Sequence, residues 1–266
     1  MHHMIALYLE VWNSKRLIFD LAKNDFKTRY AGSYFGILWA FIQPVMTILV
    51  FWFVFSVGLR TGKVKDAPFL LWFSSGIIPW FFFSEALSNA TNVFIEYSYL
   101  VKKVVFKISI LPFIKIISSL FVHLFFIAFL LVLFVLYKYP LSLTAIQILY
   151  FTGCIVFFTV SLSFLTASIA PLFKDLTQML AIILQFGMWM TPIMWNYAIL
   201  PKNCRWLLGW NPMFYIVEGY RDALINKVWF WHYPSRFFCF WAILALFFFL
   251  GGWTFKRLKP HFADML

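Results

Sequence analysis

The chain has 266 residues, of which 63% are hydrophobic and only 12% are charged, and its mean hydropathy is +0.84. Soluble domains carry about 25% charged residues, so this composition excludes a soluble protein and indicates an integral membrane protein. The net charge of +12 does not indicate a nucleic-acid-binding protein, because the basic residues flank apolar segments and form no patch in a soluble module. The three cysteines are widely separated and predict neither a disulfide framework nor a metal site.

The first predicted element is an amphipathic interface helix over about residues 15–30. Apolar residues recur there at spacings of three and four, and polar, mostly basic residues fill the opposite face. Such a helix lies in the plane of a membrane surface. It serves either as an interface anchor or as a docking surface for a cytoplasmic partner, and spacing alone favours the anchor.

Six apolar segments follow that are long enough to cross a membrane as helices. They predict an all-α fold, because they are much longer than the strands of a membrane β-barrel and lack the short alternating pattern of such strands. The expected spans cover about residues 33–57, 68–94, 113–137, 144–173, 176–195 and 237–255. No linker, repeat or soluble domain is visible, so residues 1–266 are expected to form one membrane domain.

The two longer connections differ in character. Residues 95–106 mix charged and apolar side chains and are too polar to span, so we expect a short cytoplasmic helix there. Residues 196–235 contain several Pro and Trp residues, which predict short helices that dip into or lie on the outer interface. Six spans put both termini on one side, and the positive-inside rule assigns that side to the cytoplasm because it collects most of the Lys and Arg residues.

Motifs for catalysis are absent from the sequence. The phosphate-binding pattern G-x-x-x-x-G-K-[ST] does not occur, so any ATP and its Mg²⁺ would be bound and hydrolysed on another chain. No nucleophile elbow, zinc-protease motif or close carboxylate pair occurs either. We therefore expect a non-enzyme without cofactor or metal. Among acidic residues in the expected spans, Glu85 alone qualifies for ion coupling, and it lies near the end of its span.

Five segments carry a resemblance to a known family. They are RYAGSYFGILWAFIQP at 29–44, IIPWFFFSEALSNATN at 77–92, YLVKKVVFKISILP at 99–112, TPIMW at 191–195 and NPMFYIVEGYRDAL at 211–224. Together and in this order, they resemble the permease subunit of polysaccharide-exporting ABC transporters of the ABC-2 class, which export O-antigen, capsular polysaccharide or wall teichoic acid. One departure is Phe106-Lys107, where the family commonly has a Phe-Pro pair; Pro112 is the alternative break before the third span.

The resemblance implies a multi-pass protein of the bacterial cytoplasmic (inner) membrane with both termini in the cytoplasm. Such permeases have a coupling helix between the second and third spans and re-entrant outer helices between the fifth and sixth. They form homodimers that dock two copies of a separate ATPase subunit, which binds ATP and Mg²⁺. Their substrate is an undecaprenyl-diphosphate-linked polysaccharide or teichoic acid polymer, which passes through a channel bounded by the first and fifth spans.

The resemblance also implies roles for particular residues. The cytoplasmic mouth facing lipid headgroups and the ATPase would comprise Lys23, Asp25, Lys27 and Arg29. The element that couples to the ATPase would comprise Glu96, Tyr99, Leu100, Lys102 and Lys103. The channel wall, chosen by span and helical spacing, would include Tyr34, Phe41, Trp52, Phe186 and Met190. We also hypothesise that Lys27 and Arg29 help to hold the lipid diphosphate.

Two interpretations stay open at this point. Aromatic residues make up 23% of the chain; most Phe in a membrane protein face lipid or pack helices, and the alternative is that some stack on sugar rings. The function itself has alternatives: an ABC-2 exporter of a small lipid or drug would use a closed lateral pocket, and a flippase would need no ATPase.

Overall fold

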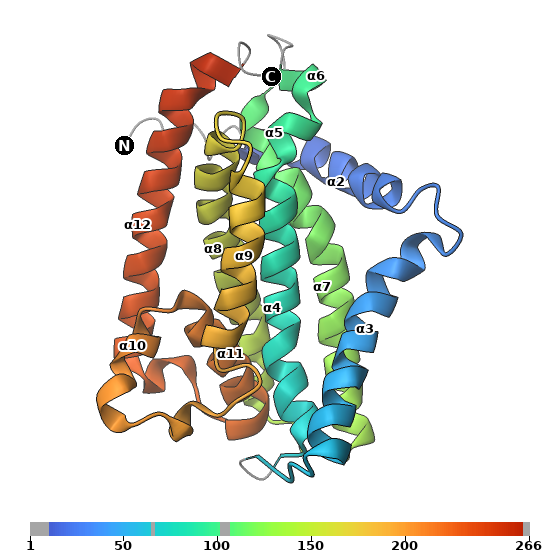
Figure 1. Cartoon of the computed structure of the whole chain (residues 1–266), viewed down its shortest axis with the longest axis vertical. Helices are drawn as coiled ribbons and strands as arrows, with labels where there is room; N and C mark the ends of the chain where they lie inside the picture. Colours follow the sequence, from blue (N-terminus) through green and yellow to red (C-terminus); the bar gives the residue numbers. More distant parts are fainter. Residues whose placement is uncertain (1–10, 65–66, 102–106, 263–266) are drawn as a thin grey trace.

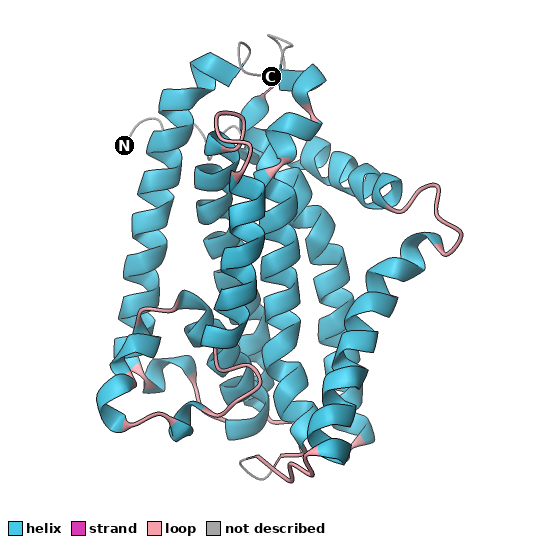
Figure 2. Cartoon of the chain, in the orientation of Figure 1, coloured by secondary structure: helices cyan, strands magenta, loops and turns pink. Residues whose placement is uncertain are grey.

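The computed structural model describes residues 11–64, 67–101 and 107–262. Over these residues Figure 2 shows helices and loops and no strand, which confirms the all-α class. The helices are α2 (Lys15–Arg29), α3 (Trp39–Trp52), α4 (Phe69–Thr91), α5 (Val93–Glu96), α6 (Ser98–Val101), α7 (Leu111–Leu136), α8 (Gln147–Ile169), α9 (Leu176–Met190), α10 (Trp206–Gly209), α11 (Pro212–Arg221) and α12 (Pro234–Leu258). Shorter helical turns extend several of them.

Five helices in the described residues are long and apolar enough to cross a membrane. With their adjoining turns they cover Gly36–Gly58, Phe69–Thr91, Ile108–Leu136, Leu143–Ile169 and Pro234–His261. The fifth expected span is occupied by α9, which has only 15 residues, fewer than the ~20 that a hydrocarbon core requires. It ends at Thr191, whose backbone is extended (φ −82°, ψ 131°), because Pro192 disfavours a helical conformation in the preceding residue.

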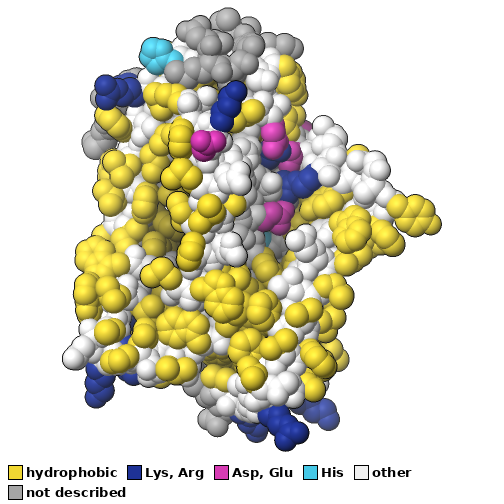
Figure 3. Space-filling model, viewed as in Figure 1, with side chains coloured by type: hydrophobic (Ala, Val, Ile, Leu, Met, Phe, Trp, Pro, Cys, Tyr) yellow, Lys and Arg dark blue, Asp and Glu magenta, His cyan; other side chains and the backbone are white. Residues whose placement is uncertain are grey.

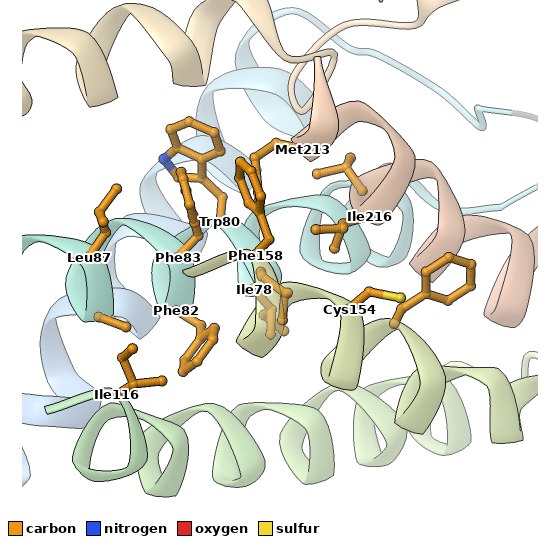
Figure 4. Close-up of a cluster of buried hydrophobic side chains, with 14 of the residues drawn as sticks. Ile78, Trp80, Phe82, Phe83, Leu87, Ile116, Cys154, Phe158, Met213 and Ile216 are labelled. Atoms are coloured by element: carbon orange, nitrogen blue, oxygen red, sulfur yellow. The ribbon is translucent and has the colours of Figure 1, made fainter. Parts of the chain in front are cut away.

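The central helix of the bundle is α4 (Figure 1). In its most apolar stretch 78% of the residues are buried, against 11% in the span that contains α3. The close-up in Figure 4 shows Phe82 and Leu87 of α4 among the side chains of neighbouring helices. In contrast, α3 leans on the bundle through a few ring contacts, such as Phe51 on Phe73 with ring centroids 5.4 Å apart. One side of α3 is therefore free of intrachain packing.

The two ends of the bundle differ. Figure 1 shows α5, α6, the C-terminal end of α12 and the transverse helix α2 near one end, and α10 and α11 near the other. We call these the α2 end and the α11 end. Residues Ile18 and Ala22 of α2 are buried, and Phe19 packs edge-on against Phe121 of α7 with ring centroids 5.7 Å apart. The amphipathic pattern therefore reflects packing on α7, and the interface position of α2 stays a prediction.

A sharp bend separates α2 from the first span. Gly32 and Gly36 have positive φ angles of 94° and 51°, a region that residues with a Cβ rarely adopt. The helical segment consequently begins at Gly36 rather than at Ser33. Pro44 lies inside α3 and cannot donate a hydrogen bond to the carbonyl of Ala40.

The connection after α4 is not the single helix that the sequence predicts for residues 95–106. It contains two short helices, α5 and α6, with a non-helical Tyr97 (φ −100°, ψ 29°) between them. Lys102, Lys103 and Phe106 lie outside the described residues.

Short helices are present in residues 196–235, as the sequence predicts, and one of them, α11, is buried in the bundle. All of its residues from Met213 to Arg221 are buried. Arg221 donates from Nη1 to the carbonyl of Pro192 at 2.6 Å and from Nη2 to the carbonyl of Ile193 at 2.7 Å, and it pairs with Glu218 at 2.7 Å. These carbonyls lack helical partners after α9 ends, so the buried arginine satisfies them and holds α11 against the end of α9.

A second buried polar contact fixes α11 from the other side. The hydroxyl of Tyr220 lies 3.0 Å from Nε2 of His123 on α7 and 2.8 Å from Oγ1 of Thr152 on α8. In the apolar interior such groups are costly without partners, so their pairing sets the depth at which α11 sits.

Candidate functional site

Charged side chains gather at the α2 end, and their burial ranges from that of Asp25 and Lys115, which are buried, to that of Glu96, which is exposed. Five charged side chains from four helices are connected to one another: Asp25 and Arg29 of α2, Glu85 of α4, Glu96 of α5 and Lys115 of α7. Figure 3 shows acidic and basic side chains lying together in the hollow beside α2. We call this group the ion-pair chain.

Asp25 is the centre of the ion-pair chain. Its side chain is 4% exposed, and its Oδ1 accepts hydrogen bonds from Nζ of Lys115 at 2.7 Å and from the hydroxyl of Tyr97 at 3.0 Å. Its Oδ2 accepts from Nη2 of Arg29 at 3.0 Å. Burial alone would raise the pKa of Asp25, but the hydrogen bonds and positive charges of Lys115 and Arg29 outweigh it and hold this pKa below its usual range.

Arg29 connects Asp25 to the central helix. Its Nη1 donates to Oε1 of Glu85 at 2.6 Å, and its Nη2 also donates to the hydroxyl of Ser118 at 3.2 Å. Burial alone would lower the pKa of Arg29, because it disfavours the charged form. The carboxylates of Glu85 and Asp25 outweigh burial and raise this pKa. The guanidinium therefore stays charged and joins α2, α4 and α7.

Lys115 connects Asp25 to the segment after α4. It forms an ion pair with Glu96 at the end of α5. Tyr97, which follows, donates its hydroxyl to Asp25; burial and that carboxylate raise the pKa of Tyr97. The ion-pair chain thus runs without a break from α5, through Lys115, Asp25 and Arg29, to Glu85 on α4.

The sequence explains this arrangement locally. Asp25 and Arg29 are four residues apart on α2 and so share one helix face. That face also carries the buried Ile18 and Ala22, so it turns Asp25 inward against α7. Lys115 lies one turn inside α7 and supplies the opposite charge. Burial of a single carboxylate would be strongly unfavourable, and these partners make it tolerable.

A groove adjoins the ion-pair chain. It lies between α3, α4 and α9, has a volume of about 550 Å³ and is open to the surface of the chain. Its lining comprises Arg29, Tyr30, Trp39, Ala40, Gln43, Pro44, Thr47, Phe81, Ser84, Glu85, Ser88, Asn89, Ala181 and Leu184. Arg29 and Glu85 belong to both features, so the last ion pair of the chain forms part of the groove wall.

The residues expected for the channel wall do not line this groove. Phe41 lies against α7, with its ring centroid 4.3 Å from that of Phe125. Tyr34, Phe186 and Met190 are exposed, at 99%, 66% and 70%. Trp52 is half-buried. Exposure on a single chain fits contact with lipid as well as with a second chain, so their channel role stays a prediction.

The residues expected at the cytoplasmic mouth and in the coupling element also differ in their exposure and contacts. Lys23 and Lys27 are exposed on α2, whereas Arg29 is held by two carboxylates. The role of Lys23, Lys27 and Arg29 at the lipid headgroups stays a prediction. Of the expected coupling residues, Glu96 takes part in the ion-pair chain, Tyr99 is exposed and Leu100 is half-buried, while Lys102 and Lys103 lie outside the described residues.

Sequence reasoning missed Lys115 as a partner of Asp25 and missed the polar lining of the groove. A signal for the groove was present: Trp39, Gln43 and Thr47 recur every four residues on α3, and Ser84 and Ser88 do so on α4. Across the described ranges, no group of three or more His, Cys, Asp or Glu side chains is placed to hold a metal ion.

Comparison with known proteins identifies the family. Residues 16–225 match the family model described as ABC-2 type transporter. The chain belongs to the ABC-2 type transporter family. The matched residues include every member of the ion-pair chain and of the groove lining.

Three relatives of this ABC-2 chain are similar over most of their lengths. An O-antigen export system permease protein, RfbA, of Klebsiella pneumoniae is 26% identical over 253 residues, which cover 94% of this chain and 95% of that protein. The protein of the same description in Myxococcus xanthus is 27% identical and covers 82% and 84%. The polysialic acid transport protein KpsM of Escherichia coli is 22% identical and covers 76% and 78%.

The ion-pair chain makes a stability prediction. Asp25→Asn leaves Lys115 and Arg29 buried without their shared carboxylate, and breaking a buried pair costs about 3 kcal/mol. We expect the purified variant to lose its fold several degrees below the wild type when detergent samples are heated and analysed by size exclusion. Asp20→Asn, at an exposed position on the same helix, is the matched control and should melt like the wild type. Equal melting of the two variants would contradict the role given to Asp25.

Proposed function

We propose that this chain is the membrane-spanning permease of an exporter that moves a lipid-linked polysaccharide across the cytoplasmic membrane, driven by ATP hydrolysis on a separate subunit. Membership of the ABC-2 family and the relatives' roles in O-antigen export and polysialic acid transport support this proposal. The sequence itself has no phosphate-binding loop, which agrees with an ATPase on another chain. In line with the family resemblance, the lipid carrier is proposed to be undecaprenyl diphosphate.

The observation that carries the proposal is the continuity between the ion-pair chain and the groove. A motor protein must move a part of the membrane subunit that it can touch, and that movement must reach the substrate path. Glu96 ends α5 and Tyr97 lies between α5 and α6 at the α2 end, whereas Glu85 lies in the groove wall. Displacement of α5 and α6 by an ATPase would pull on Lys115 and Asp25, and through Arg29 on Glu85. These residues position the groove and are not catalytic residues.

The proposed orientation places the α2 end in the cytoplasm. That end carries the exposed Lys23 and Lys27 on α2 and the exposed Lys256 and Arg257 near the end of α12. Cytoplasmic segments of membrane proteins are enriched in Lys and Arg. With this orientation, α5 and α6 face an ATPase, whereas α10 and α11 lie toward the outer side.

Homodimer formation would complete the path. On a single chain the groove is open to one side, and only Ala40 and Ile48 of α3 and Leu180 and Leu184 of α9 are buried. A second copy that covers these two helices would turn two open grooves into an enclosed channel. Each dimer is proposed to dock two copies of the ATPase. An open groove also fits a long polymer better than the closed pocket of a small-molecule exporter.

Depletion of the chain from cells that carry its gene tests the function. We expect the surface polysaccharide to disappear and the lipid-linked glycan to accumulate on the cytoplasmic side, because synthesis continues without export. Mass spectrometry of extracted lipids measures the accumulation, and re-expression of the wild type is the control. Unchanged surface polysaccharide without glycan accumulation would refute the proposal, and retention of a small amphipathic compound instead would favour the alternative exporter.

Cross-linking tests the dimer. In a variant without native cysteines, Met190→Cys should yield a dimer with a short bis-maleimide, because this residue is expected to face the partner copy. Leu149→Cys is the matched control: Leu149 is 68% exposed, close to the 70% of Met190, but lies on α8. Gel electrophoresis of membranes from cells gives the readout. A dimer band of equal strength from both variants, or from Leu149→Cys alone, would contradict an interface built from α3 and α9.

A further inference from the structure

Three polar side chains that line the groove make no hydrogen bond within the described residues. They are those of Gln43 on α3 and of Ser88 and Asn89 on α4. Thr47 and Asn92 donate only to the backbone carbonyls of Gln43 and Ser88. The groove therefore presents two amides and a hydroxyl that are ready to bind a ligand.

Their location makes these side chains informative. All three belong to helical segments long and apolar enough to cross the membrane. Gln43 lies inside its segment, where lipid offers no hydrogen bonds, and Ser88 and Asn89 lie in the last turn of theirs. A polar group that loses water without gaining a partner is unfavourable, so polar side chains in such segments face a polar occupant or a water-filled path. Gln43 and Thr47 are one turn apart on α3, as are Glu85 and Asn89 on α4, so polar groups continue along both walls.

The charge of the lining indicates the class of occupant. Arg29 and Glu85 are the charged members of the lining, and they pair with each other at 2.6 Å. The remaining printed contacts of Arg29 go to Asp25 and Ser118. A diphosphate or an acidic polymer needs several free Lys or Arg donors, and this lining does not provide them. Amides and hydroxyls instead match the donors and acceptors of sugar hydroxyl groups.

The aromatic residues in the groove lining also suit a sugar ligand. Tyr30, Trp39 and Phe81 line the same groove as the amides. Aromatic faces pack against the apolar faces of ligands, while amides and hydroxyls exchange hydrogen bonds with their edges. Weak contacts of both kinds along an open groove suit a polymer that must bind and move on.

We propose that this groove is a binding site for neutral sugar residues of the exported glycan, and that the amides of Gln43 and Asn89 determine its specificity. The inference rests on the proposed function and adds to it a substrate class, a site and two specificity-determining residues. It also separates the glycan site from the place where the lipid diphosphate binds, because the groove lining has no free cationic side chain.

Binding to the purified chain in nanodiscs tests the inference. The first probe is the oligosaccharide released by mild acid from the surface polysaccharide of the cells that carry the gene, and inorganic pyrophosphate and a short sialic acid oligomer are the competitors. Calorimetric titration measures affinity. We expect the combined variant Gln43→Leu, Asn89→Leu to bind the oligosaccharide at least about tenfold more weakly, because two hydrogen-bonding amides are lost. Neither competitor should displace it.

The matched control is Gln185→Leu, which removes an exposed amide from α9 outside the groove lining and should bind like the wild type. Heating curves establish that each variant is folded. If the combined variant does not fold, Gln43→Leu alone replaces it, since Gln43 is exposed and its substitution leaves the packing of the bundle intact. Unchanged binding by the groove variants, an equal loss in Gln185→Leu, or displacement by pyrophosphate or the sialic acid oligomer would overturn the inference. If a second copy of the chain fills the groove instead of sugar, the groove variants should dimerise more weakly and bind sugar normally. That result would also overturn the inference.

The outcome is independent of the depletion experiment. If depletion causes glycan to accumulate but the groove variants bind sugar normally, the permease function stands and the location of the sugar site is wrong. If depletion leaves the surface polysaccharide intact, the proposed function itself fails.

Discussion

Asp25 is the constraint on which the α2 end depends. A carboxylate that is 4% exposed is stable only with compensating donors, and here Lys115, Arg29 and Tyr97 supply three from three different segments. Lys115 belongs to α7 and Tyr97 to the turn between α5 and α6, so Asp25 connects α2 to both, while Arg29 on α2 itself extends the contact to Glu85 of α4. The interface helix is thereby joined to the bundle by directional contacts in addition to its apolar face.

Away from Asp25, the helices differ in how closely they pack, and the chain has a well-packed part and a loosely packed part. α4, α7, α8 and α11 pack closely around one another, and Arg221 and Tyr220 hold α11 in place at the opposite end. α3 and α9 have few buried residues and border the groove. Movement between these two helices and the rest is therefore less costly than movement within the core. An ATPase acting on α5 and α6 would transmit force through the ion-pair chain to the wall of that groove.

Apolar length was enough to predict most of the spans. α4 and α8 lie within the expected ranges, and α7 and α12 overlap theirs and extend two or three residues beyond them, because a run of about 20 apolar residues has few other stable arrangements. The exact ends of the helices depend on features that apolar length does not capture. Pro192 ends α9 early, and two glycines with positive φ delay the start of the first span.

Side-chain partners were harder to predict. Helical periodicity shows which residues share a face, but the rotation of each helix depends on tertiary packing. Phe41 therefore faces α7 although its spacing fitted a channel wall. Pro and Trp residues predicted short helices over residues 196–235, but the sequence does not show that Arg221 would donate to the carbonyl of Pro192 and pair with Glu218. Gln43 and Thr47 are four residues apart in the sequence, but this spacing does not show that they border a groove.

The most direct test of the account is the amount of glycan exported per ATP hydrolysed in proteoliposomes that contain this chain and its ATPase. Lys115→Met breaks the ion-pair chain between Glu96 and Asp25, and Lys256→Met removes an exposed lysine on α12 as the matched control. The account predicts that Lys115→Met lowers this ratio by about fivefold or more while ATP hydrolysis continues, since loss of coupling energy uncouples the two sites. Lys256→Met should leave the ratio unchanged. A wild-type ratio in correctly folded Lys115→Met would contradict transmission through the ion-pair chain.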